Sequence, residues 1–249
     1  MRIEEYISSL PPSIISGDDV QLLDDSLRDI FRFADLGKND VFYHLGCGTG
    51  NSLVIAEKEF GARSVGIDID VKKIEKAKKT TRGLEKSQVR CEDILESDIS
   101  DATVILFWFS DTTVTEIMME KFSKLDKARI ITIFDPLPWV LPSKVNFPYI
   151  LHSTPLKTTK TLKDQIRAVF DTECIDFTTA WEHAERYTKA IGSPDAGNDR
   201  FLTILQTVTI WINAKKLGLS CTEEMPDPIK AYVEILRNFF NIEVKHLLE

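Results

Sequence analysis

Between residues 40 and 135, short runs of β-branched and aromatic residues alternate with segments of helical periodicity. The expected strands occupy 41–45, 64–68, 88–91, 103–109 and 129–134, and the helices between them occupy 51–60, 71–82 and 112–125. Such alternation is typical of parallel sheets, because each parallel connection needs a crossover long enough to hold a helix. The pattern therefore predicts an α/β fold, preceded by an amphipathic helix over 19–34.

The strand signal fades after Pro155, and three amphipathic helices are expected in the rest of the chain. The first is predicted to begin with a capping box at Thr179, and the third with Asp227 as its N-cap. We therefore expect an α/β domain over 1–155 and an α-helical domain over 156–249. The helical extension would cover the site of the first domain, select its substrate or form a homodimer.

The chain carries 31 lysines and arginines against 39 acidic residues, which gives a formal net charge of −8. A protein that binds nucleic acid through its phosphates is usually basic, so DNA is not an expected partner. The first ten residues lack the apolar stretch of a signal peptide, and the densest apolar run, at 104–109, is too short to span a membrane. We expect a cytoplasmic protein without membrane attachment.

The four cysteines stand singly in the sequence, at Cys47, Cys91, Cys174 and Cys221. They form no C-x-x-C pair, and none has a histidine nearby at metal-ligand spacing. The sequence therefore predicts neither a metal site nor a disulfide framework.

The sharpest motif is VFYHLGCGTGNS at 41–52, a predicted strand that leads through Gly46, Gly48 and Gly50 into a helix. Glycines let the backbone turn tightly and approach a ligand closely at the carboxyl end of a strand. The G-x-G-x-G spacing differs from the G-x-G-x-x-G of dinucleotide-binding turns, and the Gly-Lys-Ser/Thr of a P-loop is missing. The motif predicts a ligand-binding turn at the mouth of the sheet.

Two acidic residues follow the next predicted strands. Asp68 ends the second strand, where a carboxylate can accept both hydroxyls of a ribose. Asp93 follows the third strand, where a carboxylate could accept a hydrogen bond from an adenine amino group. Asp68 as a helix cap and Asp93 as a solvated loop residue are the alternative interpretations.

In this order and spacing, the glycine loop and the two acids resemble the class I S-adenosylmethionine-dependent methyltransferases over residues 20–135. The resemblance implies a Rossmann-like sheet and S-adenosyl-L-methionine as the cofactor. Within that superfamily, the segment 93–118 looks like the Dot1-like archaeal protein-lysine methyltransferases.

The resemblance also implies which residues contact the cofactor. Its methionine part would lie against Gly46, Cys47, Gly48 and Gly50. Asp68 would hold the ribose, and Asp93 the adenine, with Ile94 in the same site. His44 stands where most family members have an acid that orients the methionine end, and a neutral imidazole provides no fixed charge. Either the site compensates, or cofactor affinity is lower, or His44 only packs beneath the loop.

The methyl acceptor is expected where the fourth and fifth strands end. Trp108, Phe109 and Trp139 could form a cation-π slot for an alkylammonium group. Ser110, Asp111 or Asp135 could orient the amine or accept its proton. We take Trp108, Asp111 and Asp135 as the candidate catalytic residues. Alternatively, the aromatic pair belongs to the sheet core and Asp135 to a turn.

We therefore expect methyl transfer to lysine side chains of a protein substrate. Methylation of small-molecule or RNA amines is an alternative, because the lysine-rich stretch 72–82 is either a solvated helix face or an RNA contact. A cofactor-binding or scaffold protein without turnover is another alternative, suggested by His44. An NAD-linked oxidoreductase is disfavoured by the glycine spacing.

Overall fold

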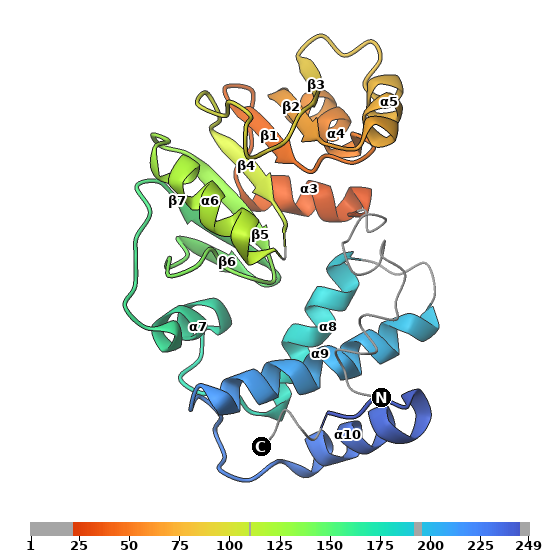
Figure 1. Cartoon of the computed structure of the whole chain (residues 1–249), viewed down its shortest axis with the longest axis vertical. Coiled ribbons are helices and arrows are strands. Elements are labelled where there is room, and N and C mark those ends of the chain that lie inside the picture. The colour runs from red at the N-terminus through yellow and green to blue at the C-terminus, as the bar shows by residue number, and fades with distance from the viewer. Residues whose placement is uncertain (1–21, 110, 192–195, 245–249) are drawn as a thin grey trace. The chain divides into compact units, whose positions relative to one another are not determined.

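The computed structural model describes residues 22–109, 111–191 and 196–244. The chain forms two compact units, a sheet unit over Leu22–Thr161 and a helical unit that begins at Leu162 (Figure 1). In Figure 1 the sheet unit is coloured red to green and the helical unit green to blue. The mixed α/β class predicted from the sequence is confirmed.

The sheet has seven strands in the order β3-β2-β1-β4-β5-β7-β6. Their bounds are β1 Val41–Leu45, β2 Arg63–Asp68, β3 Ser87–Cys91, β4 Val104–Phe107, β5 Arg129–Ile133, β6 Lys144–Asn146 and β7 Tyr149–Ser153. Strands β1 to β5 pair in parallel, whereas β7 runs antiparallel to both β5 and β6. Because β1 pairs with β2 on one side and β4 on the other, the strand order reverses there, and ligands of such sheets bind beside the carboxyl ends at that point.

Four helices belong to the sheet unit: α3 Asp24–Phe33, α4 Asn51–Phe60, α5 Val71–Thr80 and α6 Thr112–Ser123. Helix α3 lies within the helix predicted over 19–34, of which residues 19–21 lie outside the described residues. Both α5 and α6 begin after an aspartate N-cap. Asp70 accepts the backbone N–H groups of Lys72 and Lys73, and Asp111 caps α6 in the same way.

The two faces of the sheet bury different helices. Strand residues such as Tyr43 and Ile130 form one cluster with Met118 and Phe122 of α6. On the opposite face the ring of Phe42 packs edge-on against Phe31 of α3, with 4.8 Å between centroids. We call the first the α6 face, and the predicted acceptor segments lie at its carboxyl end.

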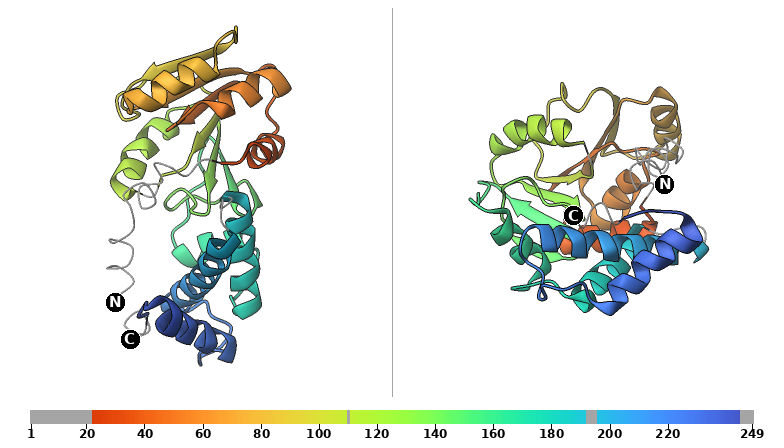
Figure 2. Two further views of the ribbon diagram at one scale, coloured as in Figure 1. Left: turned by 90° about the vertical axis from the view of Figure 1, so that its right-hand side faces the viewer. Right: turned by 60° about the horizontal axis from the view of Figure 1, so that its bottom comes forward.

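The helical unit contains α7 Leu162–Phe170, α8 Phe177–Ile191, α9 Ala196–Lys216 and α10 Asp227–Phe240. Helices α8 and α9 pack along each other (Figure 2). Helix α7 was not predicted, and two predicted starts are wrong. Asp176 rather than Thr179 caps α8, because its carboxylate accepts the N–H of Thr179 at 2.7 Å. Pro226 is the N-cap of α10, so that Asp227 is its first residue. None of the described helices is long and apolar enough to cross a membrane.

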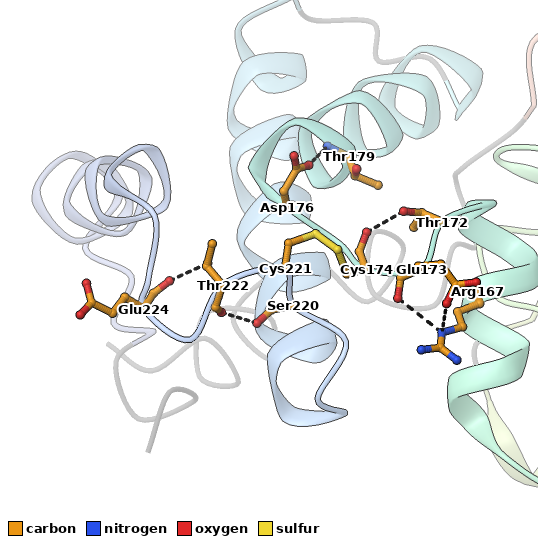
Figure 3. Close-up of a disulfide and its surroundings, with 10 residues drawn as sticks. All are labelled: Arg167, Thr172, Glu173, Cys174, Asp176, Thr179, Ser220, Cys221, Thr222 and Glu224. Atoms are coloured by element: carbon orange, nitrogen blue, oxygen red, sulfur yellow. Dashed lines mark hydrogen bonds and ion pairs between the residues drawn. A yellow bond between two sulfur atoms is a disulfide. The ribbon is translucent and has the colours of Figure 1, made fainter.

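The sequence predicted no disulfide framework, yet one disulfide joins Cys174 and Cys221 (Figure 3). The two cysteines are 47 residues apart, and the α8–α9 pair returns the chain to its starting point. A short parallel bridge fixes this approach. The N–H of Ile175 donates to the Leu219 carbonyl at 2.8 Å, and the N–H of Cys221 donates to the Ile175 carbonyl at 3.1 Å. Single cysteines far apart in sequence give no local sign of such pairing.

Candidate functional site

The loop between β1 and α4 has glycines at the two positions where other residues pack most closely against its backbone. Gly46 has φ +75° and Gly50 has φ +84°. A Cβ added to Gly46 would lie 3.1 Å from Phe109 Cζ, and one added to Gly50 would lie 3.1 Å from Ala77 Cβ. Larger residues would therefore be strained by both conformation and space. The loop is a narrow cradle whose backbone is open to a ligand.

Asp68 holds this loop from the end of β2. Its carboxylate accepts the N–H of Gly48 at 2.9 Å and the N–H of Asp70 at 2.9 Å. Its side chain is nearly buried, with 9% of the residue exposed. Helix α5 is capped by Asp70 instead, so Asp68 does not have the capping role that was the alternative interpretation. A fixed carboxylate therefore lies beside the glycine loop.

The segment after β3 returns to the same edge of the sheet. The N–H of Glu92 donates to the Asp68 carbonyl at 3.2 Å, which brings the β2 and β3 ends together. Asp93 is exposed, and its carboxylate accepts the N–H of Leu95 at 2.9 Å. Ile94 is buried in the cluster of the α6 face. The Asp93 carboxylate therefore stabilises the turn after β3 and is also exposed at this edge of the sheet.

His44 and Cys47 have no charge at neutral pH. The Nδ1 of His44 lies within hydrogen-bond distance, 2.7 Å, of Ser52 Oγ at the start of α4. Burial lowers the pKa of His44 to about 4. Burial also raises the pKa of the Cys47 thiol to about 12, and this side chain packs against Gly66. Of the two, only the imidazole has a polar contact that orients it toward α4.

A pocket of about 170 Å³ opens at the carboxyl ends of β4 and β5. Its lining consists of Phe107, Trp108, Phe109, Thr112, Thr115, Thr132, Ile133, Asp135, Pro136, Leu137 and Pro138. Phe109 also lies against the position where Gly46 lacks a side chain. The pocket and the glycine loop therefore share the ring of Phe109 as a common wall.

The pocket brings together three of the predicted acceptor residues, Trp108, Phe109 and Asp135. Asp111 is absent from the lining, because its carboxylate caps α6 through the N–H groups of Thr113 at 2.8 Å and Val114 at 3.1 Å. Trp139 is 49% exposed and is also absent from the lining. Ser110 lies outside the described residues.

Asp135 occupies a tight turn directly after β5. Its N–H donates to the Ile133 carbonyl at 2.9 Å, and the preceding Phe134 has φ +71°. Neighbouring groups partly desolvate the carboxyl and raise its pKa, although the residue as a whole is exposed to solvent. The turn and the pocket role are therefore compatible.

Sequence reasoning missed the threonines of this pocket. Thr132 is buried in β5, and within the described residues its Oγ1 has no hydrogen-bond partner. Thr112 and Thr115 come from the first turn of α6. The available signal was a polar residue inside the apolar run RIITIF at 129–134.

Two imidazoles with lowered pKa values give the sheet unit a predictable pH dependence. Burial lowers the pKa of His44 and of His152 in β7 to about 4, from an ordinary value of 6.5. Between these values the unfolded chain binds protons that the folded chain does not bind, so the free energy of unfolding should fall as the pH drops from 6.5 to 4. The fully buried His152 should contribute roughly 3 kcal/mol of this loss.

Urea unfolding of the native chain at pH 7, 6, 5 and 4 measures this loss. In a His152→Gln variant the decrease should be smaller, because glutamine does not titrate in this range. Identical pH dependence of the unfolding free energy in the two proteins would contradict a lowered pKa for His152.

Comparisons with known proteins agree with this geometry. A family model described as a methyltransferase domain matches residues 42–126. A curated protein-lysine N-methyltransferase from Saccharolobus islandicus (strain REY15A) is 31% identical over 105 residues. That alignment covers 39% of this chain and 63% of the relative, so the chain spans less than two thirds of the relative's length.

A crystal structure of an RNA methyltransferase from Salinibacter ruber in complex with S-adenosyl-L-homocysteine is also similar. It superposes with a TM-score of 0.52 at 26% identity, over 57% of this chain and 99% of the other. The resemblance to Dot1-like enzymes stays a prediction. The glycine cradle, the carboxylate beside it, the strand order and these matches lead to one conclusion: the chain contains a domain of the class I S-adenosylmethionine-dependent methyltransferase family.

Proposed function

We propose that this chain transfers a methyl group from S-adenosylmethionine to lysine side chains of a protein. The observation that carries the proposal is the position of Phe109, whose ring lies against Gly46 of the glycine loop and also lines the pocket, so that the loop and the pocket are neighbours. A donor in the loop and an acceptor in the pocket would meet at that ring, and such transfer needs mainly contact and orientation. The name of the Saccharolobus relative supports a protein lysine as the acceptor.

The donor would be held by the residues around the loop. The backbone of Gly46, Cys47, Gly48 and Gly50 would surround the methionine part. Asp68 would accept the ribose hydroxyls while it keeps its bond to the loop, and Asp93, next to Ile94, would face the adenine. When bound, S-adenosylmethionine supplies the electrophilic methyl group. His44 would contribute a neutral hydrogen-bonding group at the methionine end.

The acceptor amine would enter the pocket at β4 and β5. The indole of Trp108 and the ring of Phe109 would surround the alkyl chain and the ammonium group. The amine must lose one proton so that its nitrogen lone pair can displace the methyl group; the N–C bond would form as the methyl–sulfur bond breaks, and S-adenosylhomocysteine would leave with that bond pair. Asp135 would orient the ammonium group and accept that proton, which then leaves to solvent on its open side. Asp111 would act indirectly, by fixing the start of α6.

The test is incubation of the full chain with cell extract and heavy-methyl S-adenosylmethionine, followed by mass spectrometry of lysines. An Asp135→Asn variant should lose about 100-fold in the rate of incorporation, as expected for removal of a group that handles the proton. Its affinity for S-adenosylhomocysteine should stay within about 3-fold, a change of less than 1 kcal/mol.

Asp126→Asn is the matched control, because Asp126 is an exposed carboxylate in the loop before the amino end of β5. This variant should retain full incorporation. Label that remains at native levels in the Asp135 variant would contradict the proposed role. Tight S-adenosylhomocysteine binding without any incorporation would indicate a binding protein instead.

An RNA amine is the second candidate acceptor. The similarity to the RNA methyltransferase covers almost all of that protein. Helix α5 and the following turn also present exposed basic residues, namely Lys72, Lys76, Lys78, Lys79 and Arg82. In the same assay, label that disappears from nuclease-treated extract and is absent from protein would favour RNA.

A further inference from the structure

The loop that follows β5, residues 134–141, carries unusual backbone conformations. We call it the acceptor loop because Asp135, Pro136, Leu137 and Pro138 line the pocket. Phe134 has φ +71° and Trp139 has φ +60°, which are unfavourable for residues with side chains. Such conformations persist only where surrounding contacts hold them.

Both ends of this strained stretch are held by the backbone. The N–H of Phe134 donates to the Pro148 carbonyl at 2.8 Å, and the Trp139 carbonyl accepts the N–H of Thr159 at 2.8 Å. Between these two anchors lie Pro136 and Pro138, and proline has no N–H to donate. Leu137 therefore has the one backbone N–H within the segment 136–138.

His152 receives this hydrogen bond from inside the sheet. The N–H of Leu137 donates to His152 Nε2 at 3.2 Å. His152 lies opposite Ile130 in the antiparallel register of β7 and β5, so its side chain shares the α6 face with Ile130. The residue is 0% exposed, and Leu137 is 1% exposed. An Nε2 that accepts a hydrogen bond requires the neutral ring with its proton on Nδ1.

Replacement of His152 by an apolar residue would remove this acceptor from the buried Leu137 N–H. A buried donor that loses its partner costs about 1 to 3 kcal/mol, enough to shift a strained loop to another conformation. A shift of Leu137 would move Asp135 and Pro136, which lie within two residues of it and line the same pocket. The acceptor side of the site therefore depends on a residue that does not line it.

We propose that His152 is a positioning residue for the methyl acceptor, which fixes the acceptor loop through the N–H between its two prolines. The proposal rests on the proposed function for its effect on methyl transfer, but the anchoring itself is independent of any activity. The glycine loop follows β1, and β4 and β5 lie between β1 and β7 in the sheet, so the donor side should be insensitive to replacement of His152.

The anchoring is tested first, by amide hydrogen exchange on the full chain labelled with 15N-leucine. His152→Leu should raise the exchange rate of the Leu137 amide about 10-fold, because the acceptor is lost. His152→Gln should keep most of the protection, since its side-chain oxygen can accept the bond. His183→Leu is the control, because His183 is a mostly buried histidine of the helical unit whose Nδ1 lies 2.7 Å from the Thr179 carbonyl oxygen.

A second measurement uses the native protein, so it is valid even if the His152 variants fail to fold. The 15N shifts of His152 should show an unprotonated Nε2 and a protonated Nδ1 at pH 7. The opposite tautomer would overturn the proposal. Unchanged Leu137 exchange in a folded His152→Leu protein would overturn it as well.

The effect on methyl transfer is read from incorporation at increasing concentrations of extract protein. His152→Leu should raise the apparent KM for the acceptor about 10-fold while S-adenosylhomocysteine affinity stays unchanged, and His152→Gln should restore the native KM. A lost Leu137 bond with native acceptor KM would overturn the positioning role. If the native chain methylates nothing, the proposed function fails while the exchange and tautomer results still report on the anchor.

Discussion

Replacement of Asp68 by alanine is expected to weaken the binding of S-adenosylhomocysteine by about 100-fold. Two hydrogen bonds from the ribose to a charged acceptor would be lost, at about 1.5 kcal/mol each, and every 1.4 kcal/mol changes affinity tenfold. The N–H groups of Gly48 and Asp70 would also lose their acceptor, so the glycine loop would be less ordered. Titration calorimetry measures the affinity.

Asp70→Ala provides the control for this variant. Asp70 also accepts two backbone N–H groups, those of Lys72 and Lys73, but it caps α5 and has no predicted contact with the ribose. Its replacement should lower stability and leave the affinity within about 3-fold, under 1 kcal/mol. Equal losses of affinity in the two variants would mean that Asp68 acts only through the fold.

Removal of the disulfide in a Cys174→Ser, Cys221→Ser double variant should destabilise the helical unit by about 4 kcal/mol, because the bond closes a long loop in the unfolded chain. The loop spans 47 residues and includes α8 and α9. Hydrogen exchange of peptides from these helices, read by mass spectrometry, should increase accordingly. Reduction of the native protein should give the same result.

Cys91→Ser is the control, because Cys91 is a free and exposed thiol in the sheet unit. It should leave the exchange of α8 and α9 unchanged. Native protection in the double variant would contradict a stabilising role for the disulfide.

The sequence was sufficient for the parts of the fold that rest on local patterns. Strands β1 to β5 and helices α4 to α6 begin within one residue of their predicted starts, because apolar runs and helical periodicity repeat without interruption there. The β6–β7 hairpin was missed, since β6 has three residues and Pro148 lies between the strands. A three-residue strand next to a proline is too short to show the alternation of apolar and polar residues by which strands are recognised.

The sequence could place a candidate site residue only where its position relative to a strand or helix end is visible in the chain. Gly46 and Gly50 follow the end of β1 and Asp68 ends β2, and these positions indicated one edge of the sheet. Asp111 lies between a strand and a helix, where both a catalytic acid and a helix N-cap are common, and the sequence could not distinguish the two. His152 acts on Leu137 through the pairing of β7 with β5, and the disulfide acts across two helices. Contacts of this kind depend on the tertiary fold, which no local pattern records.

A crystal structure of the full chain grown with S-adenosylhomocysteine would show whether the glycine loop and Asp68 hold the cofactor. We expect both ribose hydroxyls within hydrogen-bond distance of Asp68, the homocysteine part along residues 46–50, and its sulfur directed toward Phe109 and the pocket. A ligand bound elsewhere, or no ligand beside residues 46–50 at saturating concentration, would contradict a cofactor site at the glycine loop.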